Sequence, residues 1–381
     1  MWRSLVLDTP KLWSAFEIEV TGSGRSSPVG HSQTLGTIKL WLERSKNCPL
    51  SISLVYKPTD RISDSRSTSL LTALIPESHR WRRVQLVMPS KNIASLPLSF
   101  PDGLPALRSL TLHMKGLWGP TSNQNLSSLN IPWHQISYLD LQCEHRNIMT
   151  LNGFLNLLSA AQRLNSCTIN LECSFDRTKI DIEKLTLPSL ESLHIILQGG
   201  LVSPDHKTDT HLVEFLNTLT LPKIQTFKLG WLVHHSWSPQ HCDFMLFLRN
   251  INPTLRSLSL AYLPVTEKQL LECFSQVTLL THLDLRFSLN DPSTDPITEE
   301  LLNVCTSYNS VMPALESFSL QCSGSHYSDS ALLELIESRR TAKLNTFHVK
   351  TMRSFDPDLE NRVRICKDDG MDIEIQSLVI R

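Results

Sequence analysis

The sequence predicts an α/β solenoid, with a parallel sheet along its inner face and helices along its outer face. Two observations predict this fold. A short pattern, apolar-x-x-apolar-x-apolar, returns about eleven times between Trp81 and the C-terminus. The segments between copies carry apolar residues at helical spacing. Neighbouring copies start 25 residues apart at the shortest, from Leu255 to Leu280, and 35 at the longest, from Leu280 to Leu315.

The pattern separates a core face from an exposed face. The fourth and sixth positions lie two residues apart, so on a strand both side chains point the same way. In the copy that starts at Leu280 these positions are Leu283 and Leu285, and they are apolar in nearly every copy. We therefore expect them in the core, with the third, fifth and seventh positions on the opposite face. The copies start at Trp81, Leu107, Ile136, Leu164, Leu190, Ile224, Leu255, Leu280, Leu315, Leu344 and Ile375.

The segments that join the strands are expected to be helices. The helices are predicted at residues 151–163, 209–219, 239–249, 266–276 and 328–339. Ser238-Pro239 indicates a cap before a first-turn proline, and Thr266 with Gln269 has the spacing of a capping box. Strand, helix and parallel strand at this length imply right-handed crossovers. The whole is typical of a leucine-rich-repeat solenoid, or horseshoe.

One feature departs from regular leucine-rich repeats. Those repeats place Asn or Cys three residues after the third apolar position, where the side chain satisfies buried backbone groups. Here that position holds residues such as Lys115, Gln198 and Ser288. Irregular loops are therefore expected.

Composition limits the classes of function. Lys plus Arg number 36 against 37 acidic residues, with no long basic stripe, so nucleic acid is not expected as a partner. No apolar run is long enough for a membrane span, and the N-terminus lacks a secretory signal. An intracellular protein, cytoplasmic or nuclear, is expected. The nine cysteines are interpreted as reduced, small hydrophobic residues.

The N-terminal residues carry a second informative pattern. It consists of Trp2-Arg3, then Thr9-Pro10-Lys11-Leu12-Trp13, then Trp41-Leu42-Glu43-Arg44-Ser45 and Pro49-Leu50-Ser51-Ile52-Ser53-Leu54. These motifs resemble those of the F-box proteins with a leucine-rich-repeat-like domain that are abundant in mushroom-forming fungi. In that family a W-R motif ends the F-box helices and a TP-x-LW segment leads out of them. A helix and strand with the pattern LWLERS…PLSLSL then opens the repeat region.

This resemblance implies a role in ubiquitin transfer. In the family the F-box docks on the Skp adaptor of a cullin ubiquitin ligase, and the repeats hold the substrate. Residues 1–33 are interpreted as the remnant of the F-box exit segment with a flexible insertion at Gly22–Gly30, and residues 34–381 as the solenoid. The F-box itself is expected to be truncated, so binding to Skp requires that it be restored. The alternative is a free-standing repeat scaffold or inhibitor without a ubiquitin role.

Several smaller features of the sequence could indicate a metal site, an enzyme or a binding patch. His234, His235, His241 and Cys242 crowd one loop and helix start, but no zinc-ligand spacing frames them, so neither a metal nor another cofactor is expected. No nucleophile motif is present, so an enzyme is not expected. Trp231, Tyr262 and Phe287 lie at one level of successive repeats. They form either an aromatic anchor for a partner or a cap on the core.

The candidate binding residues occupy the third, fifth and seventh positions of the repeats. On the concave face of the horseshoe they would form one wall that holds a target protein, with a few anchors and charge complementarity giving recognition. An ordinary solvated sheet face is the alternative. The residues are Tyr138, Asp140, Gln142, His194, Lys228, His282, Asp284, Arg286, Gln321 and His348.

Overall fold

The computed structural model divides the chain into two units, residues 1–172 and 173–381, and each is described by itself. The residues described are 2–21, 28–57, 65–89, 92–93, 96, 100, 102–115, 130–143, 149–172, 184–198, 208–233, 237, 241–306, 311–340 and 343–378.

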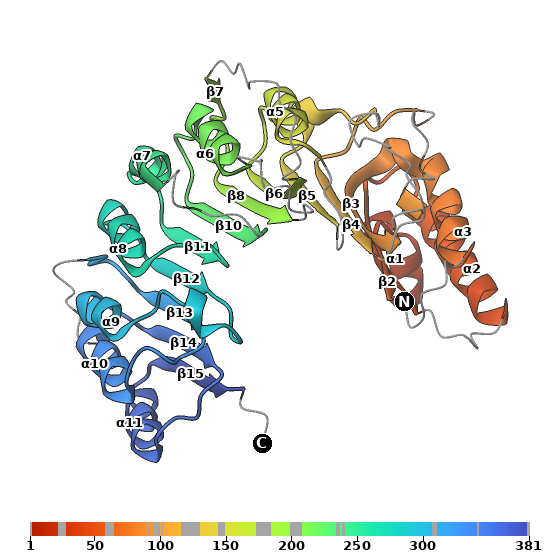
Figure 1. The fold of residues 1–381 in the computed structure, drawn as a ribbon. Coiled ribbons are helices and arrows are strands. Elements are labelled where there is room, and N and C mark those ends of the chain that lie inside the picture. The colour runs from red at the N-terminus through yellow and green to blue at the C-terminus, as the bar shows by residue number, and fades with distance from the viewer. Residues whose placement is uncertain are drawn as a thin grey trace. The chain divides into compact units, whose positions relative to one another are not determined.

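Both units are ladders of parallel strands with helices between them (Figure 1). The strands of the first unit, in spatial order, are β1 (Ala15–Thr21), β2 (Leu50–Lys57), β3 (Trp81–Pro89), β4 (Ser109–Lys115), β5 (Tyr138–Cys143) and β6 (Ser166–Glu172). Those of the second are β8 (Ser192–Gln198), β10 (Thr226–Leu232), β11 (Ser257–Ala261), β12 (His282–Arg286), β13 (Ser317–Gln321), β14 (Thr346–Thr351) and β15 (Asp372–Ser377). A separate small pair joins β7 (Leu185–Thr186) to β9 (Leu219–Thr220). Strand order follows chain order, as expected of a solenoid-like α/β fold.

The register confirms which repeat positions face the core, and it corrects the last copy: Ile375 aligns with Val349, so it holds the sixth position of that copy and not the first. Leu283 aligns with Leu258 on β11 and with Phe318 on β13, and all three side chains are buried. The intervening Asp284 is partly exposed, and His282 and Arg286 are exposed. Because aligned residues of parallel strands point to the same face, each apolar pair adds a layer to one continuous core.

Helices occupy the connections. They are α1 (Trp2–Leu7), α2 (Pro28–Ser45), α3 (Ser65–Leu74) and α5 (Leu151–Ala160) in the first unit. In the second they are α6 (Thr208–Thr218), α7 (His241–Ile251), α8 (Glu267–Gln276), α9 (Glu299–Thr306), α10 (Asp329–Arg340) and α11 (Pro357–Asp368). Short 3-10 turns are η1 (Pro10–Trp13), η2 (Ile75–Arg80), η4 (Trp133–Gln135) and η6 (Pro292–Thr294). In the second unit the helices lie along one side of the strand ladder (Figure 1).

All five predicted helices are present, with ends within three residues of those expected. The predicted capping box is confirmed. The hydroxyl of Thr266 accepts from the backbone N–H of Gln269, whose side chain accepts in turn from the N–H of Thr266. The cap predicted at Ser238-Pro239 lies outside the described residues.

In regular leucine-rich repeats a ladder of asparagines satisfies buried backbone groups. Here other buried polar side chains satisfy them. Nε2 of Gln135 donates to the carbonyl of Leu104 at 2.7 Å, and Nδ2 of Asn170 donates to the carbonyl of Cys143 at 3.0 Å. Each bond joins one repeat to its neighbour and satisfies a buried backbone acceptor. Buried backbone acceptors are therefore satisfied by different residue types in different repeats.

The structure changes the expected start of the repeat region. Strand β1 pairs in parallel with β2, so the ladder begins within residues 1–33 rather than at residue 34. The reason is visible in the sequence: Phe16, Ile18 and Val20 are buried, and the residues between them are exposed glutamates. Of the predicted flexible insertion, residues 22–27 lie outside the described part of the chain, and residues 28–30 begin α2.

Candidate functional site

The candidate site lies on the sheet of the second unit, on the side away from the helices; we call this the strand face (Figure 1). Parallel pairing sets its side chains in rows, with neighbours one strand apart. One row runs His194, Lys228, Ser259, Asp284, Ser319, His348 and Glu374. The next runs Gly230, Ala261, Arg286, Gln321, Lys350 and Gln376. Seven of the ten predicted binding residues lie on this face: His194, Lys228, His282, Asp284, Arg286, Gln321 and His348.

Asp284 organises the centre of the strand face. Its Oδ2 accepts from the hydroxyl of Ser259 on β11 at 2.9 Å and lies 2.9 Å from Nη2 of Arg286. Its Oδ1 accepts from Nε of Arg286 at 3.2 Å. One edge of the guanidinium is therefore held by the carboxylate. Since the Arg286 side chain is 55% exposed, its remaining N–H groups face solvent and are available to a partner.

Tyr262 stands at the carboxyl end of this face in an unusual backbone conformation. Its φ is +61°, a left-handed value that costs a bulky L-residue about 1–2 kcal/mol. The backbone N–H of Tyr262 donates to the carbonyl of Arg286 at 2.6 Å. The phenol oxygen lies 3.4 Å from Nε2 of Gln321, two strands away. Tyr262 thus reaches over the end of β12 while 42% of it stays exposed.

The three aligned aromatic residues do not share one role. Trp231 and Phe287 are both 2% exposed and follow the strand alternation into the core, which is the core-capping alternative. Tyr262 would follow the same alternation, but its left-handed backbone turns it outward. An anchor patch of three aromatics is therefore absent, and a single exposed aromatic stands in its place.

The strand face also carries one cation that the prediction did not name, Lys350. Lys350 is in register with Gln321 and Arg286, at the seventh position of its repeat. The position rule that found Arg286 was sufficient to find it. Among the described residues neither Lys350 nor Lys228 forms an ion pair. Two ammonium groups are therefore unneutralised by any described carboxylate.

The remaining predicted residues lie on β5 of the first unit. Asp140 accepts from Nε2 of Gln142 through Oδ1 at 2.9 Å. Its Oδ2 lies 2.9 Å from Nε2 of His113 on β4, a close ionic contact without the alignment of a hydrogen bond. Tyr138 is 40% exposed, and partial burial, with Asp140 nearby, raises the pKa of its phenol. These three residues form their own small group.

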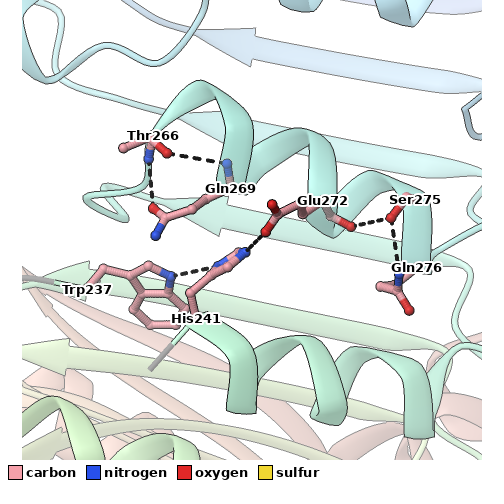
Figure 2. A network of polar contacts seen from close by, with 7 residues as sticks. All are labelled: Trp237, His241, Thr266, Gln269, Glu272, Ser275 and Gln276. Carbon is pink, nitrogen blue, oxygen red and sulfur yellow. Dashed lines mark hydrogen bonds and ion pairs between the residues drawn. The ribbon is translucent and has the colours of Figure 1, made fainter. Parts of the chain in front are cut away.

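His241, one of the four side chains that could ligate a metal, lies on the helical side of the second unit. His241 is buried at the start of α7, between Trp237 and Glu272 of α8 (Figure 2). Cys242 is exposed, and His234 and His235 lie outside the described residues. Across the part of the chain that the structure describes, no group of three or more His, Cys, Asp or Glu residues could hold a metal ion.

Within the described residues no helix has both the length and the apolar character needed to cross a membrane. No family model matches the chain, and no curated protein matches it.

Proposed function

We propose that the chain is a protein-binding repeat protein, a right-handed solenoid of the leucine-rich-repeat type whose strand face holds a target protein. The observation that carries this proposal is the ordered rows of charged, polar and histidine side chains on the strand face, with Tyr262 exposed at their carboxyl end. Rows on successive parallel strands form a rigid surface, which suits recognition better than a mobile loop does.

We further propose that this protein is the substrate-recognition subunit of a Skp/cullin/F-box ubiquitin ligase, intracellular in the cytoplasm or nucleus. The packing of the N-terminal motifs supports this. The guanidinium of Arg44 lies 4.4 Å from the ring centre of Trp13, and the rings of Trp41 and Phe16 are 5.1 Å apart. Trp13 of the TP-x-LW segment and Trp41 and Arg44 of the LWLERS segment thus hold α2 against the entry to β1.

Helix α1 supports the same proposal. Each of its six residues is exposed, including Trp2 at 80% and Leu5 at 58%. Leu12, just beyond it, is 60% exposed. A cluster of large apolar side chains in water is costly and marks a contact surface. In F-box proteins this segment ends the last F-box helix, and the apolar residues would pack against the helices before it.

Affinity purification tests the binding surface. We expect the variant His282→Ala, Arg286→Ala to lose proteins that the unchanged chain recovers. A matched variant of the helical side, Arg249→Ala with Lys268→Ala, also removes exposed cations and should keep them. If both variants recover the same proteins while far-ultraviolet circular dichroism shows an intact fold, the target does not bind the strand face.

Co-purification with the Skp adaptor tests the ligase role. We expect the 381 residues alone to elute apart from Skp, and a chain extended by F-box helices ahead of Trp2 to elute with it. Stoichiometric elution of the 381-residue chain with Skp would mean that docking uses another surface. Failure of both chains to bind would favour a free-standing scaffold or inhibitor.

A further inference from the structure

The strand face carries an excess of positive charge over β10 to β14. At the third, fifth and seventh positions of these five strands the ionised residues are Lys228, Arg286 and Lys350 against Asp284, which gives 3 − 1 = +2. Asp284 is already engaged by Ser259 and Arg286. A partner that lies over these strands therefore meets donors whose natural complement is a carboxylate.

The other acidic residues of the face, apart from Asp284, lie at one edge. Asp372 and Glu374 occupy the corresponding positions of β15, and Asp372 lies 3.4 Å from Nε2 of His348. They repel a negatively charged partner from β15. The area that attracts a negatively charged partner therefore ends before β15 and extends from β14 towards β10.

Register gives this area its dimensions. Arg286, Gln321 and Lys350 are neighbours on β12, β13 and β14, so the two cations stand about 10 Å apart with an amide between them. From β10 to β14 there are four strand spacings, about 19 Å, which an extended chain of about six residues covers. Side chains of alternate residues in such a chain point the same way.

Tyr262 supplies an apolar contact next to the charged groups. It is exposed, it is linked to Gln321 through its phenol oxygen, and its backbone is strained. A glycine would adopt this backbone angle without strain, but it would lack the phenol ring. An aromatic ring beside Arg286 offers a flat apolar surface next to charged donors, which is the usual composition of a binding hot spot.

We propose that Lys228, Tyr262, Arg286, Gln321 and Lys350 form a site for a short, extended acidic segment of the target protein. This inference rests on the proposed function and gives the chemical class of the recognised segment. Its Asp or Glu carboxylates accept from the free N–H groups of Arg286 and from the ammonium of Lys350. Gln321, which lies between the two cations and whose amide N–H groups point to the phenol oxygen of Tyr262 and to the carbonyl of Phe287, holds Tyr262 in place. Tyr262 packs against the apolar stem of one of these acidic side chains.

Fluorescence anisotropy with labelled hexapeptides tests the site. The probes are Ser-Glu-Ser-Glu-Ser-Glu, its Gln counterpart and its Lys counterpart. We expect the Glu peptide to bind and the other two to bind at least about tenfold more weakly, because charge-assisted hydrogen bonds are lost. The double variant Arg286→Gln, Lys350→Gln should weaken the Glu peptide by about tenfold or more. Arg249→Gln with Lys268→Gln, which removes the same charge from the helical side, should leave its affinity unchanged.

A second variant separates binding from folding. Tyr262→Gly should keep the fold, since the left-handed backbone suits glycine and the relief of strain offsets the lost packing of the ring, and it should weaken the Glu peptide. Weaker binding by a variant that melts as cooperatively as the unchanged chain cannot be explained by misfolding. Unchanged affinity would remove Tyr262 from the site.

Several outcomes would overturn the inference. Equal binding of the Gln peptide would show that charge is not recognised. Tighter binding of a six-nucleotide single-stranded DNA, or of the phosphoserine counterpart of the Glu peptide, would assign the cations to phosphate instead. If strand-face variants lose proteins in affinity purification but the Glu peptide does not bind, the proposed function stands and this inference fails.

Discussion

Nε2 of His241 lies 2.8 Å from Oε2 of Glu272, and this contact joins the start of α7 to α8 (Figure 2). The other ring nitrogen, Nδ1, lies 3.4 Å from Nε1 of Trp237. An indole N–H can only donate, so Nδ1 accepts, and the proton of the neutral imidazole is on Nε2, facing the carboxylate. One side chain thus satisfies a fully buried tryptophan and links two consecutive repeats.

Replacing this histidine should cost stability. In His241→Phe an aromatic ring still fills the position, but the indole N–H of Trp237 loses its acceptor in the core. A buried donor without a partner costs about 1–3 kcal/mol, and we expect that loss in the free energy of unfolding measured in urea. Glu272→Gln keeps an acceptor for Nε2 and should cost less than about 1 kcal/mol, because the carboxylate is partly exposed. A larger loss for Glu272→Gln than for His241→Phe would contradict the assigned roles.

The register of β12 predicts unequal effects at two adjacent residues. Leu283 is 2% exposed and packs between β11 and β13, so Leu283→Ala should lower the free energy of unfolding by about 2–5 kcal/mol. Asp284→Ala removes a partly exposed ion pair and a bond from Ser259 and should cost about 1 kcal/mol or less. Thermal melts of the two variants compare the losses. Equal losses would mean that the strand is shifted by one residue.

The sequence was sufficient to predict the strand ladder and five helices, because an alternating or helical apolar pattern reports burial directly. It was not sufficient for α9, where Glu299 and Glu300 open a helix of only eight residues and the buried positions Leu301, Leu302 and Cys305 span little more than one turn. Gln135 also escaped prediction, since its partner carbonyl is 31 residues away. Bonds of that length depend on packed neighbours rather than on local pattern.

The candidate site shows the same division. The position rule placed Arg286 and Gln321 on the strand face, and applied in full it reaches Lys350. Tyr262 was recognised as an aromatic of interest, but its direction depends on a backbone angle of φ +61° that strand alternation does not encode. Which cations are neutralised depends on side-chain geometry, as at Asp284, and follows from coordinates alone.

Thiol chemistry should divide the cysteines by burial. Cys242 is exposed and should react first with an alkylating reagent at pH 8, as peptide mapping by mass spectrometry would show. Burial raises the pKa of Cys273, Cys305 and Cys322 to about 12, so these thiols should react only after unfolding. Rapid labelling of any of the three in the native protein would contradict their placement in the core.

The same three thiols predict how stability changes at high pH. The unfolded chain releases thiol protons above about pH 8.5, whereas the native protein keeps them until about pH 12. The native state then binds more protons than the unfolded state, so the free energy of unfolding falls as the pH rises through this window. Urea titrations at pH 8 and pH 10 measure the fall. It should be smaller in the variant Cys273→Val, Cys305→Val, which lacks two of the three groups.

Arg339 makes the sharpest prediction on the helical side. Its side chain is 2% exposed near the end of α10, where Nε donates to the carbonyl of Cys305 at 2.5 Å. Its two terminal nitrogens donate to the carbonyls of Val311 and Met312 at 2.6 and 3.0 Å. A single guanidinium therefore satisfies three buried acceptors on the chain that leaves α9, and burial lowers its pKa.

Arg339→Met keeps an apolar stem of similar length but removes all three donors. Each buried carbonyl left without a partner costs about 1–3 kcal/mol, so we expect a loss of about 3 kcal/mol or more in the free energy of unfolding. Its neighbour Arg340 is the matched control: it pairs with Asp369 at the surface, and Arg340→Met should cost less than about 1 kcal/mol. Arg339→Lys should also be strongly destabilising, because one ammonium group cannot reproduce the planar fork that reaches three carbonyls. If urea denaturation gives equal losses for Arg339→Met and Arg340→Met, the buried guanidinium does not hold the α9–α10 connection.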